Sequence, residues 1–328
     1  MEREVPHQVF RVDPGDPLVG TRVDAALVRR LSDIPGVTRA RVRGWVEEGR
    51  VRVNGRNGAK PSRRLAPGDE VEIVLPPPPP RPELAAREMP LSVLFEDEWL
   101  LALDKPPGLV VHPSAGVWDD TLMHALLWRA RDWGPGFEGG QPRQPHLISR
   151  LDRNTSGVLL VGKAPEVHAR LQARGTVKDY LAVVYGRTGV PKGRIDLGIL
   201  PDPADRRRRI TSRTEGRPST TLWERLSESA EPLSLLRCRL LTGRTHQIRV
   251  HLQGAKLPIV GDPYYGAPGW KGIADPALAD LCRDFPRQAL HAWRVSLTHP
   301  VTREEVEISA PPPRDLSGLL SAAVLAIP

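Results

Sequence analysis

The sequence predicts an α+β protein made of two folding units, and three observations support this. Apolar residues recur at strand spacing in some segments and at helical spacing in others, without the regular alternation of a βαβ fold. Five consecutive prolines within LPPPPPRPEL, at 75–84, cannot join a helix or the middle of a sheet. The chain of 328 residues is long enough for a core on each side of that stretch.

The prolines are expected to form an extended polyproline segment that acts as a semi-rigid spacer. This predicts a first unit at 1–75, a proline-rich linker at 76–91 and a second unit at 92–328. A rigid surface loop within one domain is the alternative, and it stays open at this point.

The first unit reads as two helices followed by a hairpin and a last strand. TRVDAALVRRL (21–31) and RARVRGWVEEGRV (39–51) have apolar residues at helical spacing. VRVNGR then alternates, and its Asn54-Gly55 pair is a strong turn signal. Gly68-Asp69 marks a second turn before the strand-like VEIVL.

Arginines are concentrated on and beside the second predicted helix. A solvated charged face and a phosphate-contacting face explain such a run equally well on charge alone. The order of elements over 20–75 resembles the S4 RNA-binding domain, which implies a small α/β unit and favours phosphate contact. The arginines are Arg39, Arg41, Arg43, Arg50 and Arg52, and Arg43 is taken as their representative RNA-binding candidate.

The second unit reads as strand-rich. WLLALDKPPGLVVHP predicts a strand, a tight turn at 106–108 and another strand, while GVLLVGK is the continuous apolar run of a strand buried on both faces. DYLAVVYG and LSLLRCRLL predict two further strands. Helical patterns at 120–130 and 165–173 separate some of them, and Thr245 is a candidate cap for a helix beginning HQIRVHLQ.

Composition narrows the class of protein. A net charge of +8 and a pI of about 9.9 favour a polyanionic partner without naming one. The two cysteines, Cys238 and Cys282, are far apart, which argues against a disulfide framework or a thiolate zinc site. No segment approaches the roughly 18 apolar residues of a membrane span, and the N-terminus lacks the apolar core of a signal peptide. We therefore expect a soluble cytoplasmic protein that does not bind membranes.

The stretch HLISRLDRNTSGVLLVGK, at 146–163, places Asp152 between Arg150 and Arg153 just before a predicted buried strand. Nearby positive charge favours the ionised carboxylate, which is a poor general acid but a usable nucleophile or electrostatic stabiliser. A loop entering a buried strand also holds its side chains firmly. A structural ion pair or a turn cap is the alternative reading.

A second polar cluster, TGRTHQIRVH at 242–251, contains Arg244, His246, Arg249 and His251. The two histidines are five residues apart, so they do not share a helix face, and no metal-ligand spacing is present. We therefore expect no metal. A polar, basic helix N-terminus suits phosphate binding instead.

Two other segments have weaker signals. KPPGLVVHPSAG (105–116) has prolines where a phosphate-cradling loop needs free N–H groups, so a turn is the better interpretation. PADRRRRITSRTEGR (203–217), which contains Arg207, holds six arginines and is expected to be an exposed basic loop or strand edge in contact with a polyanion.

Together these segments resemble the RluA family of RNA pseudouridine synthases. The resemblance rests on KPPGLVVHPSAG, HLISRLDRNTSGVLLVGK, KDYLAVVYG, LLTGRTHQIRVHL, PIVGDPYYG and LHAWRVSLTHP, which follow in the family's order over about 92–312. It implies the pseudouridine synthase fold, with a central mixed, largely antiparallel sheet. It also implies conversion of uridine to its C-glycoside isomer without cofactor or metal.

The resemblance also implies roles for individual residues. Asp152 aligns with the essential aspartate, and whether that aspartate attacks the base, attacks C1′ or removes a ribose proton stays open. Arg150 aligns with the arginine that fills the place of the flipped base, and Arg244 with the arginine that pairs with the aspartate. Tyr180 aligns with the tyrosine that packs on the uracil. Leu159 and Ile248 are expected to wall the base pocket, and Arg153, His246 and Arg249 are expected to hold RNA.

One position departs from the family pattern, because Ser149 stands where a histidine usually precedes R-L-D. Three alternatives to the enzyme remain: a non-catalytic RNA-binding protein with the synthase fold, a ribosome-assembly factor, and a glycosidase-like hydrolase. The hydrolase needs a second acid, for which Asp262 is the only candidate in the matched motifs, and its Gly-Asp-Pro setting is better interpreted as a turn. The basic charge and the S4-like unit favour ribosomal RNA over tRNA as partner. We expect a monomer.

Overall fold

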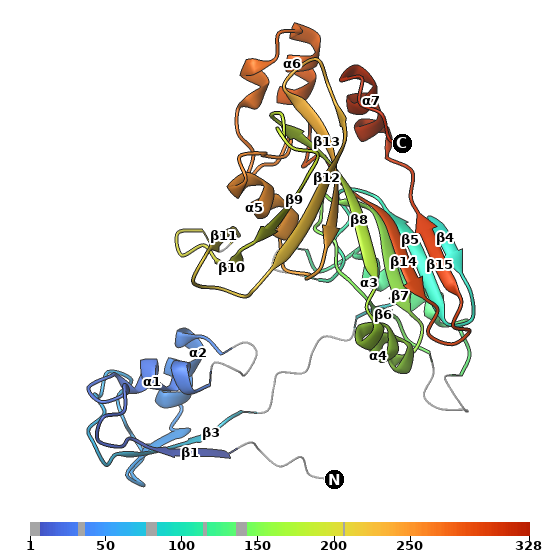
Figure 1. Cartoon of the computed structure of the whole chain (residues 1–328). Helices are drawn as coiled ribbons and strands as arrows, with labels where there is room; N and C mark the ends of the chain where they lie inside the picture. The colour runs from blue at the N-terminus through green and yellow to red at the C-terminus, as the bar shows by residue number, and fades with distance from the viewer. Residues whose placement is uncertain (1–6, 32–36, 77–83, 114–116, 136–142, 206) are drawn as a thin grey trace. The chain divides into compact units, whose positions relative to one another are not determined.

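The computed structural model describes residues 7–31, 37–76, 84–113, 117–135, 143–205 and 207–328 (Figure 1). The chain divides into two compact units, 1–83 and 84–328. The expected polyproline segment falls largely on 77–83, outside the described residues. Arg87, within the predicted linker, is bound to the second unit, since its backbone N–H donates to the His124 carbonyl at 3.0 Å.

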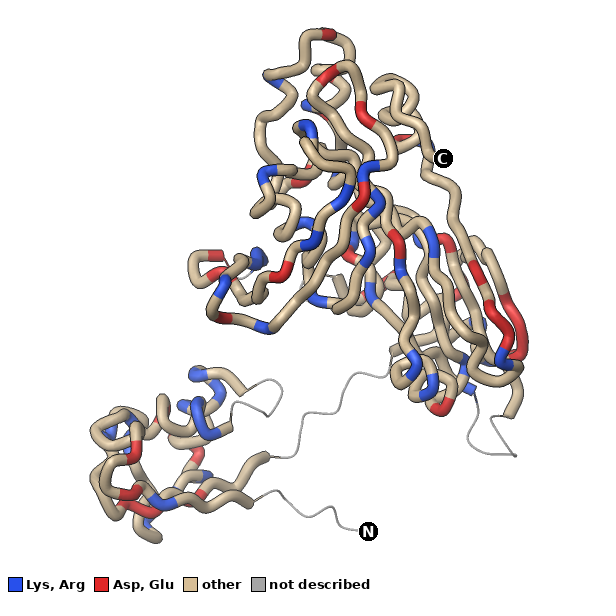
Figure 2. The backbone as a smooth tube through the Cα atoms, viewed as in Figure 1, with Lys and Arg blue, Asp and Glu red and all other residues tan. Residues whose placement is uncertain are grey.

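The first unit is a three-stranded antiparallel sheet in the order β1 (His7–Arg11), β3 (Glu70–Val74), β2 (Val51–Val53). Helices α1 (Val23–Arg30) and α2 (Arg39–Glu47) pack on it around a separate apolar core. Both helices and the turn at Asn54-Gly55 were expected, and that turn has positive φ at both residues. Strand β1 was not foreseen. Basic residues gather on and beside the helices (Figure 2).

The second unit contains a ten-stranded sheet in which only the contact between β7 and β14 is parallel. This confirms the expected mixed, largely antiparallel sheet. Its main path is β4 (Val93–Glu96), β5 (Leu100–Lys105), β7 (Ser156–Gly162), β14 (Leu290–Thr298), β8 (Val177–Tyr185), β13 (Leu233–Leu240), β12 (Thr220–Glu228) and β9 (Lys192–Asp196), with β6 (His146–Leu147) added to β7 and β15 (Glu305–Ser309) to β14.

Helices and a small hairpin surround this sheet. The predicted helical patterns at 120–130 and 165–173 are α3 (Leu122–Ala130) and α4 (Pro165–Arg174). The other elements are α5 (Gln247–Gly254), α6 (Pro276–Arg283), α7 (Arg314–Ala322), the 3₁₀ helix η2 (Gly269–Gly272) and the hairpin β10 (Gly198–Pro201) with β11 (Arg209–Ser212). Among the residues that the structure describes, no helix is both long and apolar enough to cross a membrane.

Burial on both faces explains the continuous apolar runs at 100–103 in β5 and at 158–161 in β7. Leu100 and Leu160 belong to a core that includes residues of α4, whereas Leu101 and Leu159 belong to the core that includes residues of α3 and α5. Both faces of these strands are therefore buried, as a continuous apolar run predicts. The expected second strand after the turn at 106–108 is absent, because residues 109–113 pair with no neighbouring strand in the described structure.

The parallel contact between β7 and β14 lies directly behind the segment that carries Asp152. Gly157 has φ +107, and a Cβ built there would lie 2.1 Å from the Ala292 carbonyl oxygen. Only glycine permits this approach without moving the backbone. The glycine of the T-S-G motif thus brings the start of β7 against β14 and fixes where the preceding loop ends.

Candidate active site

A cavity of about 1210 Å³ opens on the second unit, and Asp152 lies on its wall. The cavity is lined from three directions: the segment before β7, strand β8 and the segment that leads into α5. Of the described lining residues, Asp152 is the only carboxylate. The cationic lining residues are Arg150, Arg153, Lys178, Arg207, Arg209, Arg244 and Arg249. A cavity so lined attracts a polyanion around a single carboxylate.

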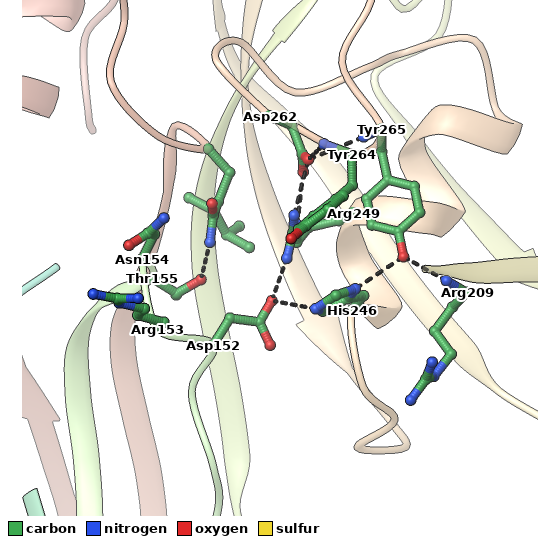
Figure 3. A network of polar contacts seen from close by, with 12 residues as sticks. Asp152, Arg153, Asn154, Thr155, Arg209, His246, Arg249, Asp262, Tyr264 and Tyr265 are labelled. Carbon is green, nitrogen blue, oxygen red and sulfur yellow. Dashed lines mark hydrogen bonds and ion pairs between the residues drawn. The ribbon is translucent and has the colours of Figure 1, made fainter. Parts of the chain in front are cut away.

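The loop that carries Asp152 is held by its own turn and by the segment before β14. The Thr155 N–H donates to the Asp152 carbonyl at 3.0 Å. Arg287 donates to the Asn154 carbonyl at 3.1 Å, and the Gln288 amide donates to the Thr155 hydroxyl at 3.0 Å. The carboxylate therefore projects from a backbone that other elements restrain (Figure 3).

Lys105 also holds the loop that carries Asp152. Its ammonium, 1% exposed, donates to the carbonyls of Pro106 (2.8 Å), Leu109 (3.1 Å) and Arg153 (2.9 Å). Burial lowers the pKa of Lys105 to about 7. The Gly108 N–H also donates to the Arg153 carbonyl, at 2.9 Å. The KPPG segment is thus a turn that braces the loop bearing Asp152.

Arg249 is the cation that contacts Asp152, at 2.8 Å between Nη1 and Oδ2. Its Nε and Nη2 donate to Asp262 at 2.6 and 2.9 Å, and its side chain is almost wholly buried. Asp262 also accepts from the N–H groups of Tyr264 and Tyr265, at 2.9 and 3.0 Å. Burial lowers the pKa of Arg249, but the bonds and charges of Asp262 and Asp152 more than offset this and raise it.

The expectation that Arg244 pairs with Asp152 was therefore wrong. Arg244 lines the cavity, and its backbone N–H donates to the Gln247 amide oxygen at 3.0 Å. Its side chain forms no hydrogen bond or ion pair with the residues that the structure describes. The reason is the position of the helix: α5 begins at Gln247, so Arg249 lies in its first turn and faces inward. Arg244 lies before the helix.

His246 forms the other contact with Asp152. It precedes α5 with φ +59, so the cap is His246 and not the expected Thr245. Its Nδ1 lies 2.9 Å from the Tyr265 hydroxyl, which accepts the Arg209 N–H at 2.7 Å. His246 Nε2 then faces Asp152 Oδ2 at 3.9 Å. Burial lowers the pKa of His246 despite the opposing charge of Asp152.

Tyr180 and Ile248 line the cavity, whereas Leu159 does not. Tyr180 is 6% exposed, and burial together with the charge of Asp152 raises the pKa of its hydroxyl, which therefore stays protonated. Leu159 points into the core because β7 is covered on both faces. Leu290 at the start of β14 is an apolar lining residue that the sequence did not reveal.

The remaining predicted RNA contacts lie at the surface. Arg150 lines the cavity and is exposed, with no hydrogen bond or ion pair to described residues. Arg153 is exposed too and donates from Nε to the Gly108 carbonyl at 3.1 Å. Arg207 pairs with Asp205 at 2.9 Å, and Arg43, in the first unit, pairs with Glu47 at 2.9 Å. Exposed pairs of this kind contribute little stability, so both arginines remain available to phosphates.

Comparison with known proteins places this site in a family. The family described as RNA pseudouridylate synthase matches residues 99–254. A protein of Xanthomonas campestris pv. campestris named ribosomal large subunit pseudouridine synthase D is 40% identical over 317 residues, covering 94% of this chain and 90% of that protein. The chain belongs to the RNA pseudouridine synthase family. It is an RNA pseudouridine synthase, as the sequence motifs implied.

A further relative, a solved structure and a second domain family also match this chain. A Nitrosomonas europaea protein of the same name is 37% identical, with 94% of this chain and 86% of that protein covered. The solved structure of human RNA pseudouridylate synthase domain containing 4 has a TM-score of 0.56 and 25% identity, covering 72% of this chain and 94% of that one. The S4 domain family matches residues 21–71.

Sequence reasoning did not identify the residues that hold the groups around Asp152. Asp262 was interpreted as a turn residue, and it does accept turn N–H groups, but it also holds Arg249. Tyr265 was given no role. Both lie in PIVGDPYYG, so the motif match itself was the available signal. In the part of the chain that the structure describes, no group of three or more metal-ligating side chains occurs.

Proposed function

We propose that this synthase converts one or more uridines of large-subunit ribosomal RNA to pseudouridine, with Asp152 as the key carboxylate. The observation that carries the proposal is the buried chain from Asp262 through Arg249 to Asp152, which ends in the basic cavity. The S4 unit and the names of the two relatives reported above support ribosomal RNA as the substrate. The proposed substrate implies action in the cytoplasm. We also propose that it acts as a monomer.

The reaction is an isomerisation, so the protein has only to break and remake bonds within one nucleotide. The bond from C1′ to N1 breaks, the uracil turns, and a bond from C1′ to C5 forms. The proton on C5 leaves and N1 gains one. Asp152 acts as nucleophile or as base, and the contact with Arg249 at 2.8 Å orients its carboxylate. Tyr180 and Ile248 then wall the space for the base.

The target base must leave its stack before it can reach Asp152. Unstacking costs a few kcal/mol, and a side chain that fills the vacated place offsets part of that cost. Arg150, exposed at the cavity and without a partner among the described residues, is the proposed side chain. Ser149, which also lines the cavity, is shorter than the usual histidine and is proposed to leave more room beside it.

The test is a map of pseudouridines across ribosomal and transfer RNA in cells with the gene, without it, and with Asp152→Asn. We expect one or more large-subunit sites to disappear in the second and third strains. Loss of transfer RNA sites alone would refute the proposed substrate. If the Asp152→Asn strain keeps every site, the carboxylate is not the catalytic group.

The non-catalytic alternatives predict that Asp152→Asn has no effect on RNA chemistry. The hydrolase alternative lacks its second acid among the described residues of the cavity. Asp262, its candidate, is fully buried and already bound to Arg249 and to two backbone N–H groups. A buried carboxylate that is bound to Arg249 in this way is not placed to protonate a glycosidic oxygen or to activate a water.

A further inference from the structure

Three lysines of the catalytic unit are buried or half-buried, and among the described residues only one of them has no counter-group. Lys105 donates to three carbonyls, and Lys163 lies 2.8 Å from Glu96 and 2.6 Å from the Asp97 carbonyl. Lys178, in β8, forms no hydrogen bond or ion pair with any residue in the described parts of the chain. An ammonium removed from water without a partner is costly.

The position of Lys178 follows from the strand. Residues two apart in a strand face the same side, so Lys178 shares the cavity face of β8 with Tyr180, about 7 Å along the strand. Asp179 between them faces away, and Arg239 holds it by two bonds of 2.8 Å. Burial lowers the pKa of Lys178, with no opposing contribution from a carboxylate.

Asp152 is the only acid among the described residues that line the cavity. The lining residues from Leu147 to Ser149, at the end of α4 and just after it are neutral, namely Leu147, Ile148, Ser149, Leu171, Gln172, Gly175 and Thr176. Arg150 directly follows Ser149 and lines the same cavity. Elsewhere on the sheet, Arg237 pairs with Glu224, and Arg225 pairs with Glu228.

We propose that Lys178 binds a backbone phosphate of the RNA next to the target uridine. The inference rests on the proposed function, because it needs an RNA strand that brings one nucleotide to Asp152. A phosphodiester supplies the missing counter-charge, and the short distance along β8 from Tyr180 to Lys178 limits the choice to a phosphate adjacent to the flipped nucleotide. Lys178 is thus a positioning residue that sets which nucleotide of the RNA reaches Asp152.

The experiment measures how RNA affinity depends on salt concentration, in a variant that cannot convert the uridine. Full-length Asp152→Asn protein, with and without Lys178→Met, is titrated with an unmodified large-subunit RNA transcript at several KCl concentrations. Each phosphate contact contributes about 0.7 to the slope of log K against log [salt] for single strands. We expect Lys178→Met to lower the slope by about that amount, and Lys178→Arg to restore it.

Two further measurements separate phosphate binding from a structural role. With Asp152 intact, Lys178→Met should raise KM and leave kcat unchanged, since a phosphate is held equally before and during the reaction. Among single phosphates near the target, one should exist whose replacement by a neutral methylphosphonate weakens binding by the protein with Lys178 and has no effect on binding by the Lys178→Met variant. Lys192→Gln, an exposed lysine outside the cavity, is the matched control.

The outcomes are distinguishable. An unchanged salt slope and KM in folded Lys178→Met overturn the inference, and so does a fall in kcat with an unchanged slope. If Lys178→Met does not fold, Lys178→Gln and the methylphosphonate series on the unaltered lysine decide instead. Failure of the parent enzyme to form pseudouridine in large-subunit RNA refutes the proposed function. The slope of log K against log [salt] still tests whether Lys178 binds a phosphate.

Discussion

Arg249 lies 2.8 Å from Asp152, and the same guanidinium donates two hydrogen bonds to Asp262. The planar fork of arginine allows one side chain to serve both carboxylates at fixed angles. Asp262 in turn is fixed by two backbone N–H groups. The orientation of the proposed catalytic carboxylate is thereby set by a turn 110 residues further along the chain.

Replacing Arg249 by Met should remove activity and destabilise the protein. Asp262 would remain buried without its cationic partner, and breaking a buried ion pair costs about 3–5 kcal/mol. Urea unfolding and single-turnover pseudouridine formation measure the two effects. Arg244→Met is the matched control, with stability within about 0.5 kcal/mol and a loss confined to RNA affinity. A larger loss of activity and stability in Arg244→Met than in Arg249→Met would restore Arg244 as the partner of Asp152.

Replacing Tyr265 by Phe should lower kcat more than it changes KM. The hydroxyl joins the Arg209 N–H to His246 Nδ1, and without it both groups lose a partner. The unfolding free energy should fall by about 1–3 kcal/mol. The control is Tyr264→Phe, because the Tyr264 hydroxyl forms no hydrogen bond with described residues. Equal kcat values for the two variants would show that the orientation of His246 does not matter.

His291 should make stability depend on pH. It is fully buried between Ser156 and the Ala310 carbonyl, at 3.0 Å from each, and burial lowers its pKa from 6.5 to about 4. Above pH 6.5 both folded and unfolded forms are neutral, so the residue has no effect. As pH falls from 6.5 towards 4, only the unfolded chain takes up the proton, and stability drops by about 3 kcal/mol.

The measurement for His291 is the unfolding free energy of the protein and of His291→Gln between pH 8 and 4. The unfolding free energy of the variant should be lower at pH 8, since the substitution disturbs two hydrogen bonds. Its decrease between pH 8 and 4 should be smaller by about 3 kcal/mol. Parallel curves would show that another group carries the acid sensitivity.

Removing residues 1–83 should leave the second unit folded. The two units have separate cores, and no apolar cluster of described residues joins them. RNA affinity should fall, together with the slope of log K against log [salt], because the arginines of α2 and its neighbours are lost. Circular dichroism and salt-dependent binding test this. Unfolding of the truncated chain would mean that the two units share stability.

The sequence by itself determined many of the strands and helices and the identity of the enzyme. β5, β7, β8 and β13 were readable because their apolar patterns reflect burial on one or both faces, and α1 to α4 because apolar residues recur at helical spacing. The strands β9, β12, β14 and β15 were not identified, since polar and charged residues interrupt their apolar patterns.

Only the tertiary structure decided which cation meets the carboxylate. Arg150 and Arg153 flank Asp152 in sequence, yet neither pairs with it, because a strand-leading loop sends adjacent side chains in different directions. Arg249 does pair with it, since α5 starts at Gln247 and packs its first turn against the loop. Local sequence specifies which groups are charged, and the packing of distant segments specifies which of them touch.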